Sequence, residues 1–208
     1  MAQVGYAALL HYRPALLRII SLRRCCVFDQ QQFLLFLGMI YPLHYPDFFT
    51  ATILQWQKLL QPDKDKTIIT NSFKYLVEEK RVQVFGFAIM YNHIHVIWRA
   101  TNDQNRIKVQ HAFMTYTAQT ILKDLKLHHA KVLPHFKVNA KDRTYQIWER
   151  NPLSVELRSN EVLFQKLQYI HQNPVRAGIC NVPEDYRFSS ASLYVNETSE
   201  WGFLEKWG

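Results

Sequence analysis

The stretch Phe85–Trp98, FGFAIMYNHIHVIW, carries two histidines, His93 and His95, within a run of residues that favours β-strand. Because strand side chains alternate between faces, both imidazoles project from one side, while Ile94 and Val96 project from the other. Two imidazoles fixed side by side form half of a site for a divalent metal. The same pattern also fits two half-buried histidines that bond to their neighbours, so the rest of the chain must decide.

Around this stretch the sequence predicts alternating strands and helices. A β-branched and aromatic run, Phe48–Leu54, predicts the first strand. The polar segment Pro62–Lys66 predicts a turn, and apolar residues then recur at helical spacing up to Lys80. The further predicted elements are strands at 82–90 and 93–99 joined by a turn at Tyr91-Asn92, a helix over 105–127 with Asn105 as N-cap, a strand over 145–148, and a helix over 160–171.

The order β-α-β-β-α-β is typical of the ferredoxin-like split βαβ, an α+β fold with an antiparallel sheet. We assign residues 47–208 to this domain and residues 1–46 to an N-terminal extension, and we expect helical extensions at both ends. The apolar run Phe33–Ile40 is too short to span a bilayer, so no membrane association is predicted. The fold hosts many functions and does not decide among them.

Composition favours a globular domain with a polyanionic partner. Of the 208 residues, 48% are hydrophobic, and the formal net charge is +8. Residues 1–46 contribute four arginines and one aspartate, so the remainder still carries about +5, enough to favour DNA as a partner. The three cysteines, Cys25, Cys26 and Cys180, do not suggest a disulfide framework. An odd count suits a reducing compartment, and we predict a cytoplasmic protein.

The helix predicted over 105–127 carries a candidate nucleophile. Val109 and Phe113 share one side at helical spacing and are expected in the core, whereas Tyr116 lies on the flank. In a split βαβ this helix can pack beside the strand that bears the histidines. A tyrosine can act as a covalent nucleophile when a metal polarises the electrophile. An aromatic residue on a helix is nevertheless more often part of the packing.

Basic residues near the histidine strand suggest a surface for nucleic acid. Arg99, Arg106 and Lys108 lie on or beside that strand and the following helix, close to aromatic residues on which bases can stack. Asn173-Pro174 is expected to end the last helix, and Arg176 projects beyond it, where a guanidinium can bind phosphate or base edges. A purely structural role is equally compatible with this corner, which Gly178 completes as a turn residue.

These motifs, in this order, resemble the REP-associated tyrosine transposases, a group of the single-tyrosine HUH transposases. The resemblance covers the chain from about Asp47 to Tyr194. The matching segments are Phe49–Thr52, His93–His95 preceded by Met90 and Asn92, Phe113–Thr117, Tyr145–Asn151, Tyr169–Gly178 and Tyr186–Ser190. Of these, Tyr169–Gly178, YIHQNPVRAG, is the most distinctive.

The resemblance implies a mechanism and its residues. In that family two histidines hold Mg²⁺ or Mn²⁺ at a scissile phosphate of single-stranded or hairpin DNA, and a helix tyrosine attacks to form a 5′-phosphotyrosine. Carried over by motif, His93 and His95 are the ligands and Tyr116 is the nucleophile. A third ligand is expected about one turn beyond the tyrosine, where Gln119 lies nearest although Thr120 occupies the i+4 position. The resemblance also implies that Asn173 and Arg176 face the DNA.

Several alternatives stay open at this point. The first function is metal-dependent nicking and strand transfer at hairpins, and the second is a catalytically inactive, domesticated protein that binds DNA hairpins. Tyr91, in the turn before His93, and Tyr169, on the last helix, compete with Tyr116 for the role of nucleophile. Relatives include monomers and homodimers, and either state is compatible with the sequence.

Overall fold

The computed structural model describes residues 45–101 and 104–208, and these residues form an α+β domain around one antiparallel sheet. The extension predicted for residues 1–46, with its helix, therefore lies almost wholly outside the described residues. The strands are β1 (Asp47–Thr52), β2 (Val82–Ile89), β3 (His93–Ala100) and β4 (Leu153–Glu156), in the sheet order β2-β3-β1-β4. This order, with β3 between β1 and β2, is that of the predicted split βαβ.

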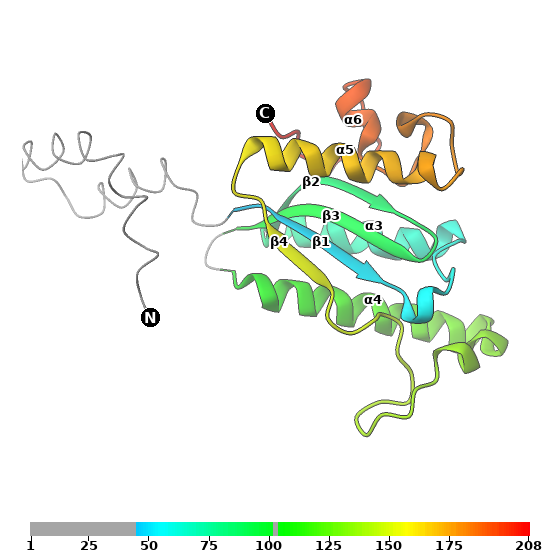
Figure 1. Ribbon diagram of the computed structural model, residues 1–208. Coiled ribbons are helices and arrows are strands. Elements are labelled where there is room, and N and C mark those ends of the chain that lie inside the picture. The colour runs from blue at the N-terminus through cyan, green and yellow to red at the C-terminus, as the bar shows by residue number, and fades with distance from the viewer. Residues whose placement is uncertain (1–44, 102–103) are drawn as a thin grey trace, which may run out of the picture. The chain divides into compact units, whose positions relative to one another are not determined.

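Two long helices cover one face of the sheet, and a third lies against the other (Figure 1). Helix α3 (Asp63–Glu78) connects β1 to β2, and α4 (Arg106–His128) connects β3 to β4. Right-handed crossovers place both on the same face. Helix α5 (Asn160–Arg176) returns across the opposite face, and the short elements η3 (Leu54–Trp56), η4 (Ala130–Phe136), η5 (Pro183–Asp185) and α6 (Ala191–Val195) complete the fold.

Each face has its own apolar core. On the face of α3 and α4, the α3/α4 face, Phe49 and Trp98 of the sheet meet Phe73 of α3 and Phe113 of α4 in a buried aromatic cluster. A smaller cluster fills the other face, which we call the α5 face, and there Phe48, Phe85, Ala88, Ile97, Leu163, Leu167 and Ile170 pack together. Strand alternation decides this division, because Phe48 and Phe49 are neighbours that point to opposite faces.

Gly86 lets α5 approach the sheet closely. A Cβ atom at this position would overlap the Cδ2 of Leu167, so another residue here would force the leucine side chain to move. The pairing of β2 with β3 also shifts register between Val84 and Gly86. Because α5 rests mainly on β2, it leaves the opposite edge of the α5 face, at β4, uncovered.

The structure corrects three predicted boundaries. The strand predicted over 145–148 is wrong, because this segment forms only isolated bridges, Lys137 with Tyr145 and Ile53 with Trp148, and the fourth strand is β4. The turn predicted at Pro62–Lys66 is mostly helix, since Pro62 is the N-cap of α3. The prediction that Asn173-Pro174 ends the last helix is also wrong. Helix α5 continues to Arg176, where Gly178, at φ +67°, completes the turn.

Candidate functional site

His93 and His95 lie on the α5 face, at the end of β3 that follows the turn Tyr91-Asn92. Their ring centroids are 4.8 Å apart. The Nδ1 of His95 lies 2.7 Å from the Oγ1 of Thr50 on β1, which pairs with it across the sheet. The Nδ1 of His93 lies 2.7 Å from the Oδ1 of Asn92, and since an amide oxygen only accepts, Nδ1–H donates to it. Both rings are therefore fixed through Nδ1.

The two imidazoles are held in the neutral form. Burial lowers the pKa of His93 to about 4. Burial likewise lowers the pKa of His95 to about 3, assisted by the positive charge of Lys166 and by the proximity of His93, since the two rings cannot easily be protonated together. A neutral imidazole that donates through Nδ1–H presents the lone pair of Nε2, which is the form that binds metal. The Nε2 of His95 is buried and has no hydrogen-bond partner within the described residues.

Tyr169 of α5 is the tyrosine that faces this pair. Its ring centroid lies 5.5 Å from that of His95 in an edge-on arrangement and 6.1 Å from that of Phe48. The side chain is 40% exposed, so it is accessible as well as close. Phe48 also stacks on His95 at 5.4 Å, and the four rings thus form one contiguous cluster.

Tyr116 lies on the other side of the sheet. It belongs to α4, whose buried residues Phe113 and Ile121 pack into the α3/α4 core, and its side chain is 56% exposed on the outside of that helix. The prediction that α4 brings Tyr116 beside the histidines is therefore wrong. Gln119, the predicted third ligand, is an exposed residue of the same helix and is separated from them in the same way. Tyr91 lies in the predicted turn, with its ring over Lys66.

Asn173 occupies the position one turn beyond Tyr169. Residues i and i+4 share a helix face, so Asn173 lies on the side of α5 that Tyr169 presents to the sheet. Its Nδ2 is buried without a partner within the described residues. An amide's nitrogen and oxygen are assigned from their surroundings, so this position offers an unsatisfied polar group of either kind. Tyr169 and Asn173 therefore show the tyrosine-to-amide spacing that Tyr116 lacks.

Two cations of α5 flank Tyr169. The Nζ of Lys166 lies 5.0 Å from the ring centroid of Phe48 and 5.7 Å from that of Tyr169, and the guanidinium of Arg176 lies 5.8 Å from the latter. Neither takes part in an ion pair within the part of the chain that the structure describes. Positive charge next to the histidines is thus not neutralised by a neighbouring carboxylate, which suits an anionic ligand.

The other predicted DNA-binding residues lie elsewhere. Arg106 bonds to Asp47 at 2.8 Å and Glu156 at 2.9 Å, and so ties α4 to β1 and β4. Arg99 donates to the Oε1 of Gln83 and lies over Phe85 at the far end of β3. Asn173 and Arg176 lie on α5 close to Tyr169, the residue that faces the histidines, whereas Lys108 is exposed on α4.

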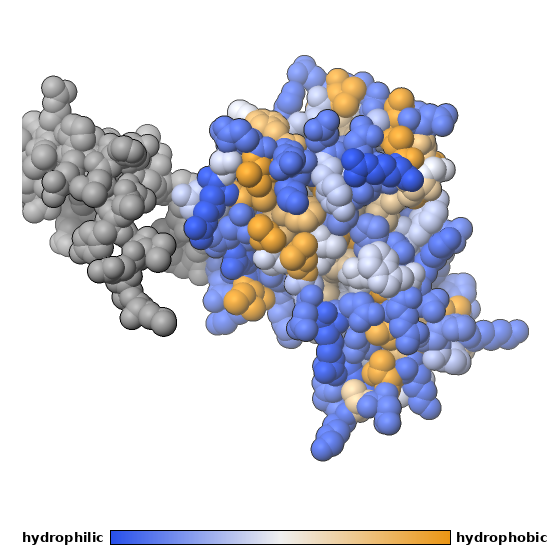
Figure 2. All heavy atoms as spheres, in the orientation of Figure 1, coloured by the Kyte–Doolittle hydropathy of each residue, from blue (hydrophilic) through white to orange (hydrophobic). Residues whose placement is uncertain are grey.

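An exposed apolar strip borders the site. Leu153 and Val155 of β4 pair with Thr50 and Phe48 on β1, and are 54% and 42% exposed. Hydrophobic side chains gather over β4 between α5 and α4 in the space-filling view (Figure 2). The strip continues from the ring cluster of the histidine site across the part of the α5 face that α5 does not cover.

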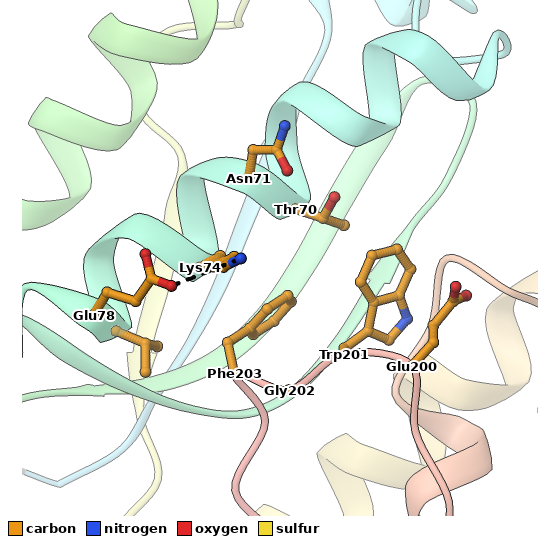
Figure 3. Close-up of a pocket in the computed structure, with 9 residues that line it drawn as sticks. Thr70, Asn71, Lys74, Glu78, Glu200, Trp201, Gly202 and Phe203 are labelled. Atoms are coloured by element: carbon orange, nitrogen blue, oxygen red, sulfur yellow. Dashed lines mark ion pairs between the residues drawn. The ribbon is translucent and has the colours of Figure 1, made fainter.

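Outside the histidine site, the described residues offer few candidate sites for a metal or a small ligand. Within residues 45–101 and 104–208, no group of three or more His, Cys, Asp or Glu side chains could hold a metal. A cavity of about 360 Å³ lies between α3 and the C-terminal segment (Figure 3). Its lining includes the ion pair of Lys74 and Glu78 but no histidine, cysteine or tyrosine.

Within the described residues, no helix combines the length and the apolar character that are needed to span a bilayer.

Comparisons with known proteins confirm the resemblance inferred from sequence. No protein-family profile matches the chain. A curated protein of Haemophilus influenzae, named "Putative REP-associated tyrosine transposase", is 22% identical over 168 residues, which cover 77% of this chain and 90% of that protein. A solved structure of a REP-associated tyrosine transposase bound to a REP hairpin superimposes with a TM-score of 0.53 at 17% identity, covering 81% of this chain and 90% of that one. The likeness in fold confirms the α+β architecture.

Proposed function

We propose that this protein nicks and rejoins single-stranded DNA beside a hairpin, through a covalent 5′-phosphotyrosine formed on Tyr169. One observation carries the proposal: two neutral histidines on β3, the half-buried His93 and the buried His95, face a tyrosine ring of α5 that lies 5.5 Å from the ring of His95. The likeness to a REP-associated tyrosine transposase, and to one bound to a hairpin, supports DNA hairpins as the substrate class.

The donor set fits a divalent metal such as Mg²⁺ or Mn²⁺. His93 and His95 would hold it through Nε2, and the orphaned Nε2 of His95 supports this assignment. Asn173 replaces Gln119 as the proposed third ligand, because a side-chain amide suits these ions and because its own amide is buried and unsatisfied. When bound, the ion supplies Lewis acidity at the scissile phosphate.

The remaining steps belong to the protein's own residues. Lys166 and Arg176 hold the phosphate against Tyr169 by charge. The Oη of Tyr169 bonds to phosphorus while the bond from phosphorus to the 3′ oxygen breaks. The phenol releases one proton and the departing 3′-hydroxyl gains one, so no oxidant or nucleotide cofactor is consumed. Reversal by another 3′-hydroxyl rejoins a strand.

A trapped intermediate tests the proposal. The full chain is incubated with Mg²⁺ or Mn²⁺ and a hairpin oligonucleotide whose cleaved fragment is too short to stay bound. We expect an adduct that survives denaturing electrophoresis, and that is lost with a chelator or in His93→Ala. Manganese binding, measured by electron paramagnetic resonance, should fall in the same variant. Hairpin binding without an adduct under any condition would contradict nicking and favour an inactive hairpin-binding protein.

Cellular location and assembly are separate expectations. We propose a cytoplasmic protein, on the cysteine pattern, that acts as a monomer or homodimer. Sedimentation of the full chain with and without a hairpin oligonucleotide would decide between these two states.

A further inference from the structure

Trp56 lies exposed beside the histidines. It ends η3, directly after β1, and 62% of its side chain is accessible. Its ring centroid is 5.9 Å from that of His93 in an edge-on arrangement. Its backbone oxygen lies 3.5 Å from the Nδ2 of Asn92, the residue whose Oδ1 fixes His93. The indole therefore belongs to the same local structure as the histidine pair.

The backbone beneath this side chain is strained. Gln55 and Trp56 have φ values of 53° and 57°, in the left-handed region that bulky residues rarely adopt. The conformation is held from outside, since the N–H of Gln55 donates to the Oε1 of Glu149 at 2.6 Å, and Leu54 bonds to the carbonyl of Ile147 at 2.7 Å. Strain of this kind persists only where the surroundings enforce it, and it gathers at functional sites.

An isolated surface tryptophan would need no explanation, but this one combines exposure, strain and contact with His93. Tryptophan is highly buried on average, because leaving its ring in water forfeits a large hydrophobic gain. We propose that Trp56 is a stacking platform for the nucleobase adjacent to the phosphate at His93 and His95. This inference rests on the proposed function and adds a subsite to it.

The chemistry of the surface fits an unpaired base. A flat, apolar ring next to a phosphate site matches a single strand, in which each base lies within one nucleotide of its phosphate. Stacking uses the π-face that every base possesses, so Trp56 should position the strand without reading its sequence. A base held in a duplex already stacks on its neighbours and would gain little from the indole.

The test is a double-mutant cycle in which the protein change is Trp56→Ala and the DNA change is the removal of a single base. Hairpin oligonucleotides carry one abasic site, moved along the single-stranded arm, and binding to the full chain is followed by fluorescence anisotropy with a chelator present to prevent cleavage. At one position we expect base removal and Trp56→Ala each to weaken binding about 5-fold or more, with no further loss when they are combined. Trp56→Phe should keep part of this coupling.

Tyr75→Ala is the matched control, because Tyr75 is 56% exposed on α3, away from the histidines. It should change affinity little and show no coupling at any position. Additive losses for Trp56→Ala at every abasic position would overturn the proposal, even if the protein nicks DNA normally. Coupling at one position in a protein that forms no covalent adduct would support the platform while contradicting nicking, so the two failures are distinguishable.

Discussion

The two faces of the sheet differ in what they bury and in what they expose. On the α3/α4 face, aromatic and aliphatic side chains close over one another, and Thr117, a buried polar residue there, is satisfied by Phe113 and Trp148. On the α5 face the helix covers only part of the sheet, and the buried groups include His95 and Asn173, each with an atom that has no partner within the described residues. In the proposed function the first face supplies stability, and the second offers polar groups for chemistry.

The largest effect expected from this comparison is on stability at the α3/α4 face. Phe113 is 1% exposed and contacts Phe49, Phe73 and Trp98. Phe113→Ala should lower the free energy of unfolding by about 3–5 kcal/mol, because it removes buried area and leaves a cavity. Urea denaturation followed by circular dichroism measures the change. A loss below about 1 kcal/mol would show that this face is not the main core.

At the α5 face we expect a large loss of activity and a smaller loss of stability. His95→Ala should reduce DNA cleavage at least about 100-fold, since it removes the proposed metal ligand. Its cost in stability should be smaller than that of Phe113→Ala, because the hydroxyl of Thr50 loses a partner but the aromatic core is intact. Single-turnover cleavage and denaturation of the same preparation give both values. Cleavage at the wild-type rate would reject the site.

Acidification should weaken the α5 face selectively. Burial lowers the pKa of His95 to about 3 and that of His171, whose Nε2 lies 2.8 Å from the Oγ of Ser190, to about 4. The unfolded chain takes up protons near pH 6.5 whereas the folded chain does not, so stability is full above pH 6.5 and falls toward pH 4. We expect a loss on the order of 1–2 kcal/mol per histidine between pH 6.5 and 5.

Denaturation at several pH values, with a chelator present, checks this dependence. His171→Gln should make the free energy of unfolding depend less steeply on pH, because it removes one of the buried groups that take up a proton only after unfolding. A stability that is constant from pH 7 to 5 would mean that these histidines take up protons in the folded protein as readily as in the unfolded chain.

The smallest effects should separate two arginines. Arg106, which bonds to Asp47 and Glu156, serves structure, and Arg106→Gln should lower stability by about 1–2 kcal/mol, because the buried carboxylate of Asp47 loses this ion pair, with little effect on DNA affinity. Arg176 lies over Tyr169, and Arg176→Gln should weaken binding and reduce the slope of log affinity against log salt by about 0.7 for a single strand. Titrations at several salt concentrations measure both. Equal slopes for the two variants would remove Arg176 from the binding surface.

The sequence was sufficient for the elements whose pattern is local. Alternation around His93 and His95 predicted both β3 and the shared face of the imidazoles, and Asn105 caps α4 as predicted, accepting from the N–H of Lys108. The four-residue strand β4 escaped prediction because Tyr145–Trp148 has the stronger β composition. Its partner on the sheet is chosen by tertiary pairing with β1, which no local pattern reveals.

Tyr116 was expected beside the histidines because sequence reasoning placed α4 near them without deciding which face of the sheet that helix covers. Strand alternation and the crossover rule together resolve this, since α3 and α4 must share a face and Ile94 and Val96 point toward it. The spacing from Tyr169 to Asn173 was the feature of the sequence that favoured Tyr169 as a candidate nucleophile. Trp56 had no such signal, because the conformation that exposes it depends on Glu149, distant in sequence.

The position of the covalent bond tests most directly whether the chemistry lies on the α5 face. The adduct trapped with Mg²⁺ on a hairpin oligonucleotide is digested with protease and nuclease, and the modified peptide is sequenced by mass spectrometry. The account predicts a nucleotide on Tyr169, and an adduct that is absent in Tyr169→Phe but present in Tyr116→Phe. A nucleotide on Tyr116, or an adduct that persists in Tyr169→Phe, would contradict it.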